Sequence, residues 1–285
     1  MLERKPLLWF LTIAFVISWP LFLIPLAFQE NRTQVMVLCW SLGMWGPGIA
    51  AIVTTLFIEK KPFRALRLKT LGPKRFYLWA WLLPPALTLL TLGSTVLLGT
   101  GEFDSNLTMI RDALAKAPAT PGLPPVEILV ALQIVFAVTL APFINALFAL
   151  GEELGWRGYL LPKLLPLGQW PAILISGAVW GVWHAPAILQ GHNFPRHPYL
   201  GMLLMIIGCI LLGVILSWLT LNTRSPWVAA LAHGSANAVP VLAIYFLLPG
   251  VDLAWGGSLF SVAGWVVMGL FIAWLMLTKR LPVPI

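Results

Sequence analysis

Eight stretches of this chain run for more than about 18 residues without an Asp, Glu, Lys or Arg, which is the pattern of a membrane-spanning helix. Backbone groups in lipid must bond internally, so such stretches form helices. The predicted spans are Leu7–Phe28, Val35–Ile58, Phe76–Gly99, Ile128–Leu150, Trp170–Gln190, Tyr199–Leu221, Pro226–Leu248 and Ser258–Thr278. Because 59% of the residues are hydrophobic, no separate soluble domain remains. The sequence predicts an all-α integral membrane protein with eight transmembrane helices in a single polytopic domain, residues 1–285.

The net charge is +8, and the basic residues are distributed along the chain as the expected membrane topology requires. The charge therefore does not indicate a nucleic-acid partner. If the N-terminus faces inward, only four basic residues lie in outward segments, namely Arg32, Arg111, Lys116 and Arg196. The inward segments hold the others, which are Arg4, Lys5, Lys60, Lys61, Arg64, Arg67, Lys69, Lys74, Arg75, Arg157, Lys163, Arg224, Lys279 and Arg280. Cytoplasmic loops carry such an excess of Lys and Arg, so both termini are predicted to be cytoplasmic.

A few polar side chains interrupt the apolar spans. Burying an ionisable group in a bilayer costs about 2.5 to 3.5 kcal/mol on insertion scales, so each one marks a candidate functional site. Such residues occur in the fourth, fifth and seventh predicted spans, as Glu152 and Glu153, His184, and His233 with Asn237. Arg157 follows at the predicted cytoplasmic edge.

Helical spacing suggests a different role for each of the two carboxylates. Glu153 and Arg157 are four residues apart with the acid first, the favourable order for an ion pair. We therefore expect Arg157 to hold Glu153. Glu152 is then less compensated and available to activate water.

The same spacing predicts that polar groups from three helices converge in one intramembrane site. His233 and Asn237 share a face of the seventh span, and Trp180 and His184 share a face of the fifth. Small residues let membrane helices approach closely. Each motif helix carries two of them four residues apart, Gly151 with Gly155, Gly177 with Gly181, and Ala230 with Gly234.

Several functions are compatible with this set of residues. Glu and His can activate water for peptide hydrolysis, while His and Asn can donate hydrogen bonds to an oxyanion. Glu152, His184 and His233 could instead hold a metal ion such as Zn²⁺, although no H-E-x-x-H motif is present. A non-catalytic membrane scaffold is the alternative, and a proton-coupled transporter is a third. Two features weigh against a transporter. The polar groups cluster at one end of the predicted spans and do not follow a pathway across the membrane, and the sequence has no internal repeat.

Three motifs occur in order along the chain: E-E-x-x-x-R at Glu152–Arg157, an aromatic-x-x-x-H at Trp180–His184, and H-x-x-x-N at His233–Asn237. Together they resemble the CAAX protease and bacteriocin-processing (CPBP) family of intramembrane metalloproteases, which includes the Ras-converting enzyme. The resemblance covers about residues 126–248. One departure is Trp180, where the family usually has Phe.

The resemblance implies an endopeptidase that cleaves a membrane-associated, CAAX-like protein or peptide. It implies that Glu152 with His184 activates water, that His233 and Asn237 stabilise the oxyanion, and that Glu153 and Arg157 support the site. Relatives of this kind in bacteria resemble peptide-processing and bacteriocin-immunity factors. The short loops are typical of a prokaryotic plasma-membrane protein, and the site is expected to open toward the cytoplasmic half of the bilayer.

Two further histidines, His192 and His197, fall in the predicted outward loop Gly191–Pro198 beside Pro195. We expect them to be solvated loop residues outside the site.

Overall fold

The computed structural model describes residues 3–118 and 121–284, and within these ranges the chain is helical with no β-strand. A single isolated bridge pairs Phe103 with Leu247. The α-helices are α1 (Arg4–Leu23), α2 (Arg32–Gly43), α3 (Gly46–Val53), α4 (Arg75–Leu97), α5 (Thr108–Lys116), α6 (Val126–Thr139), α7 (Ala141–Gly155), α8 (Leu161–Leu164), α9 (Gln169–Trp183), α10 (Ala185–Leu189), α11 (Pro198–Thr223), α12 (Pro226–Ala238), α13 (Val241–Ile244) and α14 (Val262–Leu277). The predicted all-α class is confirmed.

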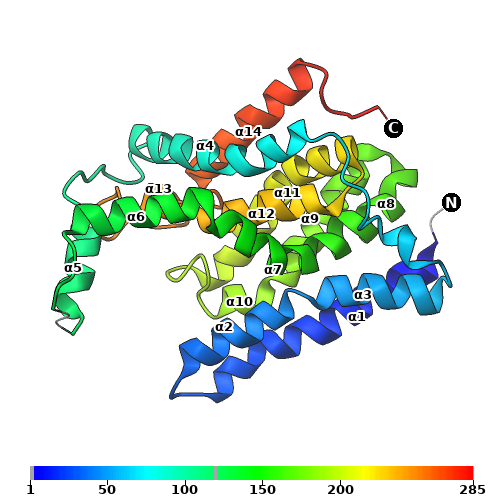
Figure 1. Cartoon of the computed structure of the whole chain (residues 1–285), viewed down its shortest axis with the longest axis horizontal. Coiled ribbons are helices and arrows are strands. Elements are labelled where there is room, and N and C mark those ends of the chain that lie inside the picture. The colour runs from blue at the N-terminus through cyan, green and yellow to red at the C-terminus, as the bar shows by residue number, and fades with distance from the viewer. Residues whose placement is uncertain (1–2, 119–120, 285) are drawn as a thin grey trace.

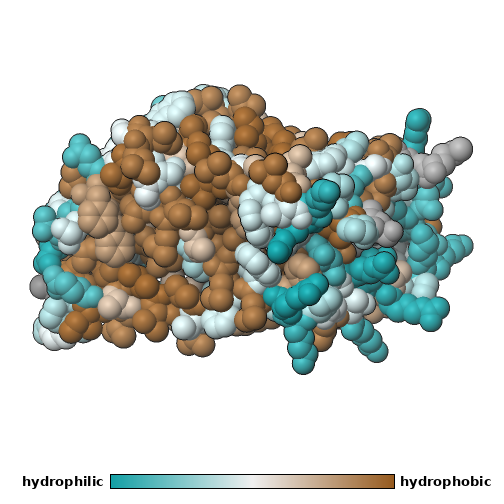
Figure 2. Space-filling view, turned by 90° about the horizontal axis from the view of Figure 1, so that it is seen from above, coloured by the Kyte–Doolittle hydropathy of each residue, from teal (hydrophilic) through white to brown (hydrophobic). Residues whose placement is uncertain are grey.

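The long helices run along one axis, and α7, α9, α11 and α12 lie between the α1–α3 layer and the pair α4 and α14 (Figure 1). Both chain ends lie at the same end of this bundle, near α8, while α5 lies at the opposite end (Figure 1). Apolar side chains cover the middle of the molecule, and hydrophilic side chains gather mainly at the end that carries the termini (Figure 2). This surface fits a protein embedded in a bilayer.

The eight predicted spans are confirmed only in part. Five helical segments are long and apolar enough to cross a membrane, and α6 with the helical segment Ala141–Leu167 makes a sixth if the pair, bent by 49°, counts as one span. Helix α14 has 16 residues and is shorter than the others. The predicted span Trp170–Gln190 is divided at His184 into α9 and α10.

Proline causes two of these breaks, and tryptophans from other helices satisfy the carbonyls that the breaks release. Pro142 has no N–H for the Val138 carbonyl, which instead accepts a 2.6 Å bond from the indole of Trp81. At the second break, one residue before Ala185–Pro186, the Trp183 carbonyl accepts a 3.1 Å bond from Trp19. Such partners make a broken helix stable in lipid.

The fourth span continues beyond its predicted end at Leu150. Helix α7 runs to Gly155, and a π-helical stretch, Trp156–Leu160, carries it on into α8. The charged residues of this segment are buried inside the bundle, with Arg157 only 1% exposed. Arg157 also lines a second cavity together with Arg67 and Arg224 of the predicted cytoplasmic segments, so its position at the cytoplasmic edge stays a prediction.

Small residues set close helix contacts, but only one of the three predicted pairs joins two motif helices. Gly151 and Gly155 of α7 pack against the start of α3, and the glycines of α9 pack against α11. A Cβ on Gly234 of α12 would lie 2.5 Å from the Ala146 backbone nitrogen of α7. A Cβ on Gly181 of α9 would lie 2.5 Å from Cα of Ile206 in α11. The α7–α12 contact is thus direct, while α9 is positioned through α11.

Gly234→Ala is expected to lower the free energy of unfolding by about 1 to 3 kcal/mol, because the new methyl group would overpack a backbone contact. Gly93→Ala in α4 is the matched control, since a Cβ there meets nothing within 4 Å. Alanine favours a helix more than glycine does, so this control should be neutral or stabilising. Thermal unfolding in detergent compares the two, and equal stability of both variants would contradict the close packing of α12 on α7.

Candidate active site

Glu153 is the most enclosed group of the site. Its carboxylate is fully buried and accepts bonds of 2.9 and 3.0 Å from Nη1 of Arg157, which confirms the predicted pair. The same carboxylate accepts a 2.9 Å bond from Nδ1 of His233 in α12. Glu153 therefore ties the two helices together through one buried ionic network.

Glu152 points to a different environment, as the spacing predicted. One carboxylate oxygen accepts a 2.7 Å bond from the indole N–H of Trp180, and the side chain lines a cavity. It is only 2% exposed and makes no ion pair with Arg157. A buried carboxylate without its own cation is the less stabilised of the two.

Trp180 has a larger role than its place in the motif indicated. Its ring lies 4.3 Å beneath the Arg157 guanidinium and contacts the rings of His184 and His233 at 5.6 and 5.2 Å. A phenylalanine could make these ring contacts but not the bond to Glu152. The departure from the family's usual Phe therefore adds a hydrogen bond within the site.

The two histidines are held in the same way, each through Nδ1. The ring of His184 donates from Nδ1 to the Trp180 carbonyl over 2.9 Å, because a carbonyl can only accept. His233 donates from Nδ1 to Glu153. In both rings Nε2 is the nitrogen left to face a ligand.

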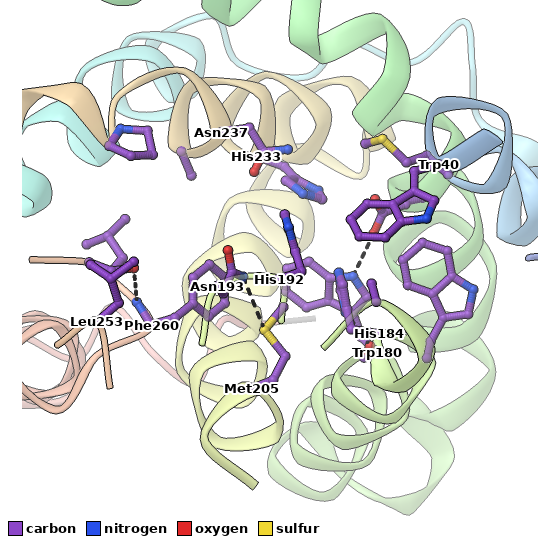
Figure 3. Close-up of a pocket in the computed structure, with 18 of the residues that line it drawn as sticks. Trp40, Trp180, His184, His192, Asn193, Met205, His233, Asn237, Leu253 and Phe260 are labelled. Carbon is purple, nitrogen blue, oxygen red and sulfur yellow. Dashed lines mark hydrogen bonds between the residues drawn. The ribbon is translucent and has the colours of Figure 1, made fainter. Parts of the chain in front are cut away.

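One cavity of about 470 Å³ is lined by all four predicted catalytic residues, Glu152, His184, His233 and Asn237. Asn237 lies one turn beyond His233 on α12, and no described residue bonds its amide. Figure 3 shows Asn237 and His233 on one side of this space, His184 and Asn193 on the other, and Leu253 and Phe260 at one end. The helix break at His184 allows residues from α9 and the following loop to line the same wall.

The predicted metal ligands, Glu152, His184 and His233, all line this cavity. Among residues 3–118 and 121–284, however, no three His, Cys, Asp or Glu side chains gather closely enough to hold a metal ion. Each of the three candidates already uses one polar atom in a bond to Trp180 or Glu153. The described residues therefore offer no ready-made three-ligand cluster, although Nε2 of both histidines stays free, and we derive no step through a metal.

His192 is an exposed loop residue, as predicted, but it also lines the cavity, so the expectation that it lies outside the site is wrong. Its ring packs edge-on against Trp40 with centroids 5.1 Å apart. Partial loss of hydration beside these neighbours lowers the pKa of His192. Only the close return of the α10–α11 loop onto α2 reveals this position, and the sequence carried no signal for it.

His197 lies outside the cavity lining, as predicted, but it is not a free loop residue. Its Nε2 pairs with Asp252 at 2.7 Å, and Arg196 donates a 2.8 Å bond to the Gly250 carbonyl. Burial opposes the ionisation of Asp252, but bonds from the Ala254 N–H and His197 outweigh it and lower the pKa of Asp252. These contacts tie the loop before α11 to the loop before α14.

The cavity extends toward the end of the bundle away from the termini. Its lining includes Phe22, His192, Asn193, Leu253 and Phe260, which lie in or beside connections at that end. The expectation that the site opens to the cytoplasmic half of the bilayer stays a prediction, since the structure assigns neither end of the bundle to a side of the membrane.

The bundle thus holds a buried ionic network beside a polar cavity, and two comparisons show which proteins the chain is similar to. Residues 127–239 match the family model described as type II CAAX prenyl endopeptidase Rce1-like. The chain is also 25% identical over 246 residues to "CAAX prenyl protease 2" of Methanococcus maripaludis, covering 80% of this chain and 81% of that protein. Both matches agree with the family resemblance seen in the motifs, and they favour a protease over the scaffold and transporter interpretations.

Replacing the two neighbouring acids should separate their roles. Glu153→Gln should lower the free energy of unfolding by about 3 to 5 kcal/mol, because it leaves Arg157 buried without its counter-charge. Glu152→Gln should cost less than about 1 kcal/mol, since an amide oxygen still accepts the Trp180 bond. Thermal or denaturant unfolding in detergent measures both. A Glu152→Gln variant as unstable as Glu153→Gln would contradict this division.

Proposed function

We propose that this protease hydrolyses peptide bonds within the membrane through water activated by Glu152 and His184. The observation that carries the proposal is the convergence of Glu152, His184, His233 and Asn237 on one cavity enclosed by apolar helices. A carboxylate and an imidazole that line the same cavity are suited to move a proton from water to a leaving amine.

Glu152 is the general base of this mechanism. Its bond from Trp180 orients the carboxylate without neutralising it, so it can take a proton from a water molecule in the cavity. His184, fixed by its Nδ1 bond, offers the lone pair on Nε2 to orient that water. The oxygen then attacks the carbonyl carbon of the peptide bond, and Glu152 passes its proton to the departing amine.

His233 and Asn237 stabilise the negative oxygen of the tetrahedral intermediate. The amide of Asn237 donates directly, whereas His233 can donate from Nε2 only when its ring carries both protons. Glu153 beside Nδ1 favours that charged ring. Two carboxylates then face two buried cations, Arg157 and His233, and the cluster is balanced in charge.

The proposed substrate is a membrane-associated protein or peptide, in keeping with the name of the methanogen relative. The proposed setting is a prokaryotic plasma membrane with both termini in the cytoplasm, which the inward basic residues support. Zn²⁺ is also proposed as a cofactor, and the chelator experiment below tests it.

Purified protein in liposomes should cleave a library of membrane-anchored peptides, and Glu152→Gln should reduce the rate by about 10² to 10⁴-fold through loss of the general base. Asn237→Ala should reduce it by about 10² to 10³-fold through loss of an oxyanion donor. Mass spectrometry of the products measures both rates. Wild-type activity in Glu152→Gln would contradict the proposed base.

Two controls accompany this assay. Asn222→Ala removes an amide from α11 that bonds only its own helix, to the Trp218 carbonyl, and it should retain activity. A chelator arm tests the metal: loss of cleavage, restored by added Zn²⁺, would assign a metal, and unchanged cleavage would favour the side chains alone.

A further inference from the structure

The second cavity, which Arg157 lines, has a volume of about 330 Å³ and lies beside α8, at the end of the bundle that carries the chain termini (Figure 1). We call it the arginine cavity. Its wall comes from the loop 59–75, the π-helical stretch with α8, the junction of α11 with α12, and the C-terminal tail, and it includes Arg67, Arg157, Leu161, Thr220, Arg224 and Pro284. The described linings of this cavity and of the catalytic cavity have no residue in common. Small-ligand sites measure about 300 to 1,000 Å³, so the arginine cavity has room for a group larger than water.

The wall of the arginine cavity is positively charged. Its described residues include three arginines, Arg67, Arg157 and Arg224, and no Asp or Glu. Glu153 neutralises Arg157. Arg67 and Arg224 are exposed, and neither forms an ion pair with a residue of 3–118 or 121–284. Two cations without a counter-charge therefore remain on this wall, where they attract an anion.

Arg157 also has buried N–H groups that lack an acceptor. Its side chain is 1% exposed and donates from Nη1 to Glu153, but within the described part of the chain nothing accepts a bond from Nε or Nη2. The Trp180 ring lies against the face of the guanidinium, whereas these N–H groups lie in its plane and need an acceptor there. A buried charged donor without an acceptor is unfavourable, so an acceptor held in the arginine cavity would stabilise Arg157.

A phosphate group suits these three arginines better than a carboxylate does. The guanidinium fork donates parallel hydrogen bonds to phosphate oxygens. Arg67, Arg157 and Arg224 belong to three separate segments and so reach the cavity from different directions. A phosphate group has more oxygens than a carboxylate, and they form a tetrahedron, so donors from several directions can bond to it at once.

The rest of the wall indicates that this phosphate belongs to a lipid. Leu161, Leu165 and Leu221 are apolar and would dehydrate a free phosphate ion without replacing its water. A lipid headgroup would instead place its glycerol and the upper part of its acyl chains against them. The cavity also lies at the end of the bundle where the apolar surface gives way to hydrophilic side chains (Figure 2). Basic pockets between membrane helices bind the headgroups of anionic lipids.

We propose that the arginine cavity binds the phosphate group of an anionic lipid, held by the exposed Arg67 and Arg224 and by the free N–H groups of the buried Arg157. Arg157 connects this site to the catalytic one, because its Nη1 holds Glu153 and its guanidinium packs on Trp180. A bound lipid therefore stabilises the buried ionic network without entering the catalytic cavity. The lipid site goes beyond the proposed hydrolysis and does not depend on it.

The site is tested by lipid binding to the full chain in detergent, followed by native mass spectrometry with phosphatidylglycerol as the probe. The double variant Arg67→Gln with Arg224→Gln removes two cations of the cavity. Arg64→Gln with Lys279→Gln is the matched control, because it removes the same charge outside the lining, and Lys279 shares the left-handed backbone of Arg224, with φ of 56° and 55°.

Wild type and the control should each bind one phosphatidylglycerol with the same affinity. The cavity variant should bind it about 100-fold more weakly, because each lost charge-assisted contact contributes about tenfold or more. Equal affinity of the cavity variant and the control would overturn the proposed site.

Two further probes separate a lipid from a free ion. Phosphatidylcholine with the same acyl chains has no net charge and should bind to wild type about tenfold more weakly than phosphatidylglycerol. Inorganic phosphate should displace phosphatidylglycerol only at a concentration about 100-fold or more above that of the lipid, because it lacks the apolar contacts. Inorganic phosphate that binds as tightly as the lipid would overturn the lipid assignment. Binding of neither probe would show that the cavity holds water only and would overturn the proposal.

The contact with Arg157 is tested by thermal unfolding in detergent with and without saturating phosphatidylglycerol. The lipid should raise the Tm of wild type and of the matched control by about 5 °C, and that of the cavity variant by much less. Glu153→Gln should gain more than wild type does, because the phosphate then supplies the only counter-charge that Arg157 has within the described network. A gain in Glu153→Gln no larger than that of wild type would overturn the contact with Arg157, and an equal gain in the cavity variant and the control would overturn the site.

Discussion

The buried network of Glu153 with Arg157 and His233 is the interaction on which the site depends. It joins α7 to α12 at membrane depth, where an unpaired charge would be very unfavourable. Because Glu153 neutralises Arg157, the chain can continue as a helix through a charged segment without reaching water. The same network leaves Glu152 facing the cavity with only an indole N–H as partner, so a structural pair and a reactive acid arise from adjacent residues.

Local sequence rules predicted much of this arrangement. Four-residue spacing was enough for the Glu153–Arg157 pair and for the shared face of His233 and Asn237, since both depend only on helix geometry. The helix breaks at Leu140 and His184 were not predictable, because they depend on Trp81 and Trp19 reaching carbonyls more than 50 residues away in the sequence. The position of His192 depends likewise on the return of its loop onto Trp40.

The burial of the charged segment is the clearest case of a property that tertiary structure determines. In the sequence, Glu152 and Arg157 stand close to the predicted end of a span. The π-helical stretch after Gly155 carries this segment onward, and Trp156 and Leu161 are fully buried within it. The catalytic cavity extends toward the loops of His192 and Leu253, which are tied together by the His197–Asp252 and Arg196–Gly250 contacts.

The account as a whole depends on one acid, Glu152. The most direct measurement of it compares the wild type and Glu152→Gln in liposomes, each given a lipid-anchored peptide, with the products followed by mass spectrometry. We predict cleavage by the wild type and a rate about 10² to 10⁴-fold lower for Glu152→Gln. Equal cleavage by the two folded proteins would contradict it.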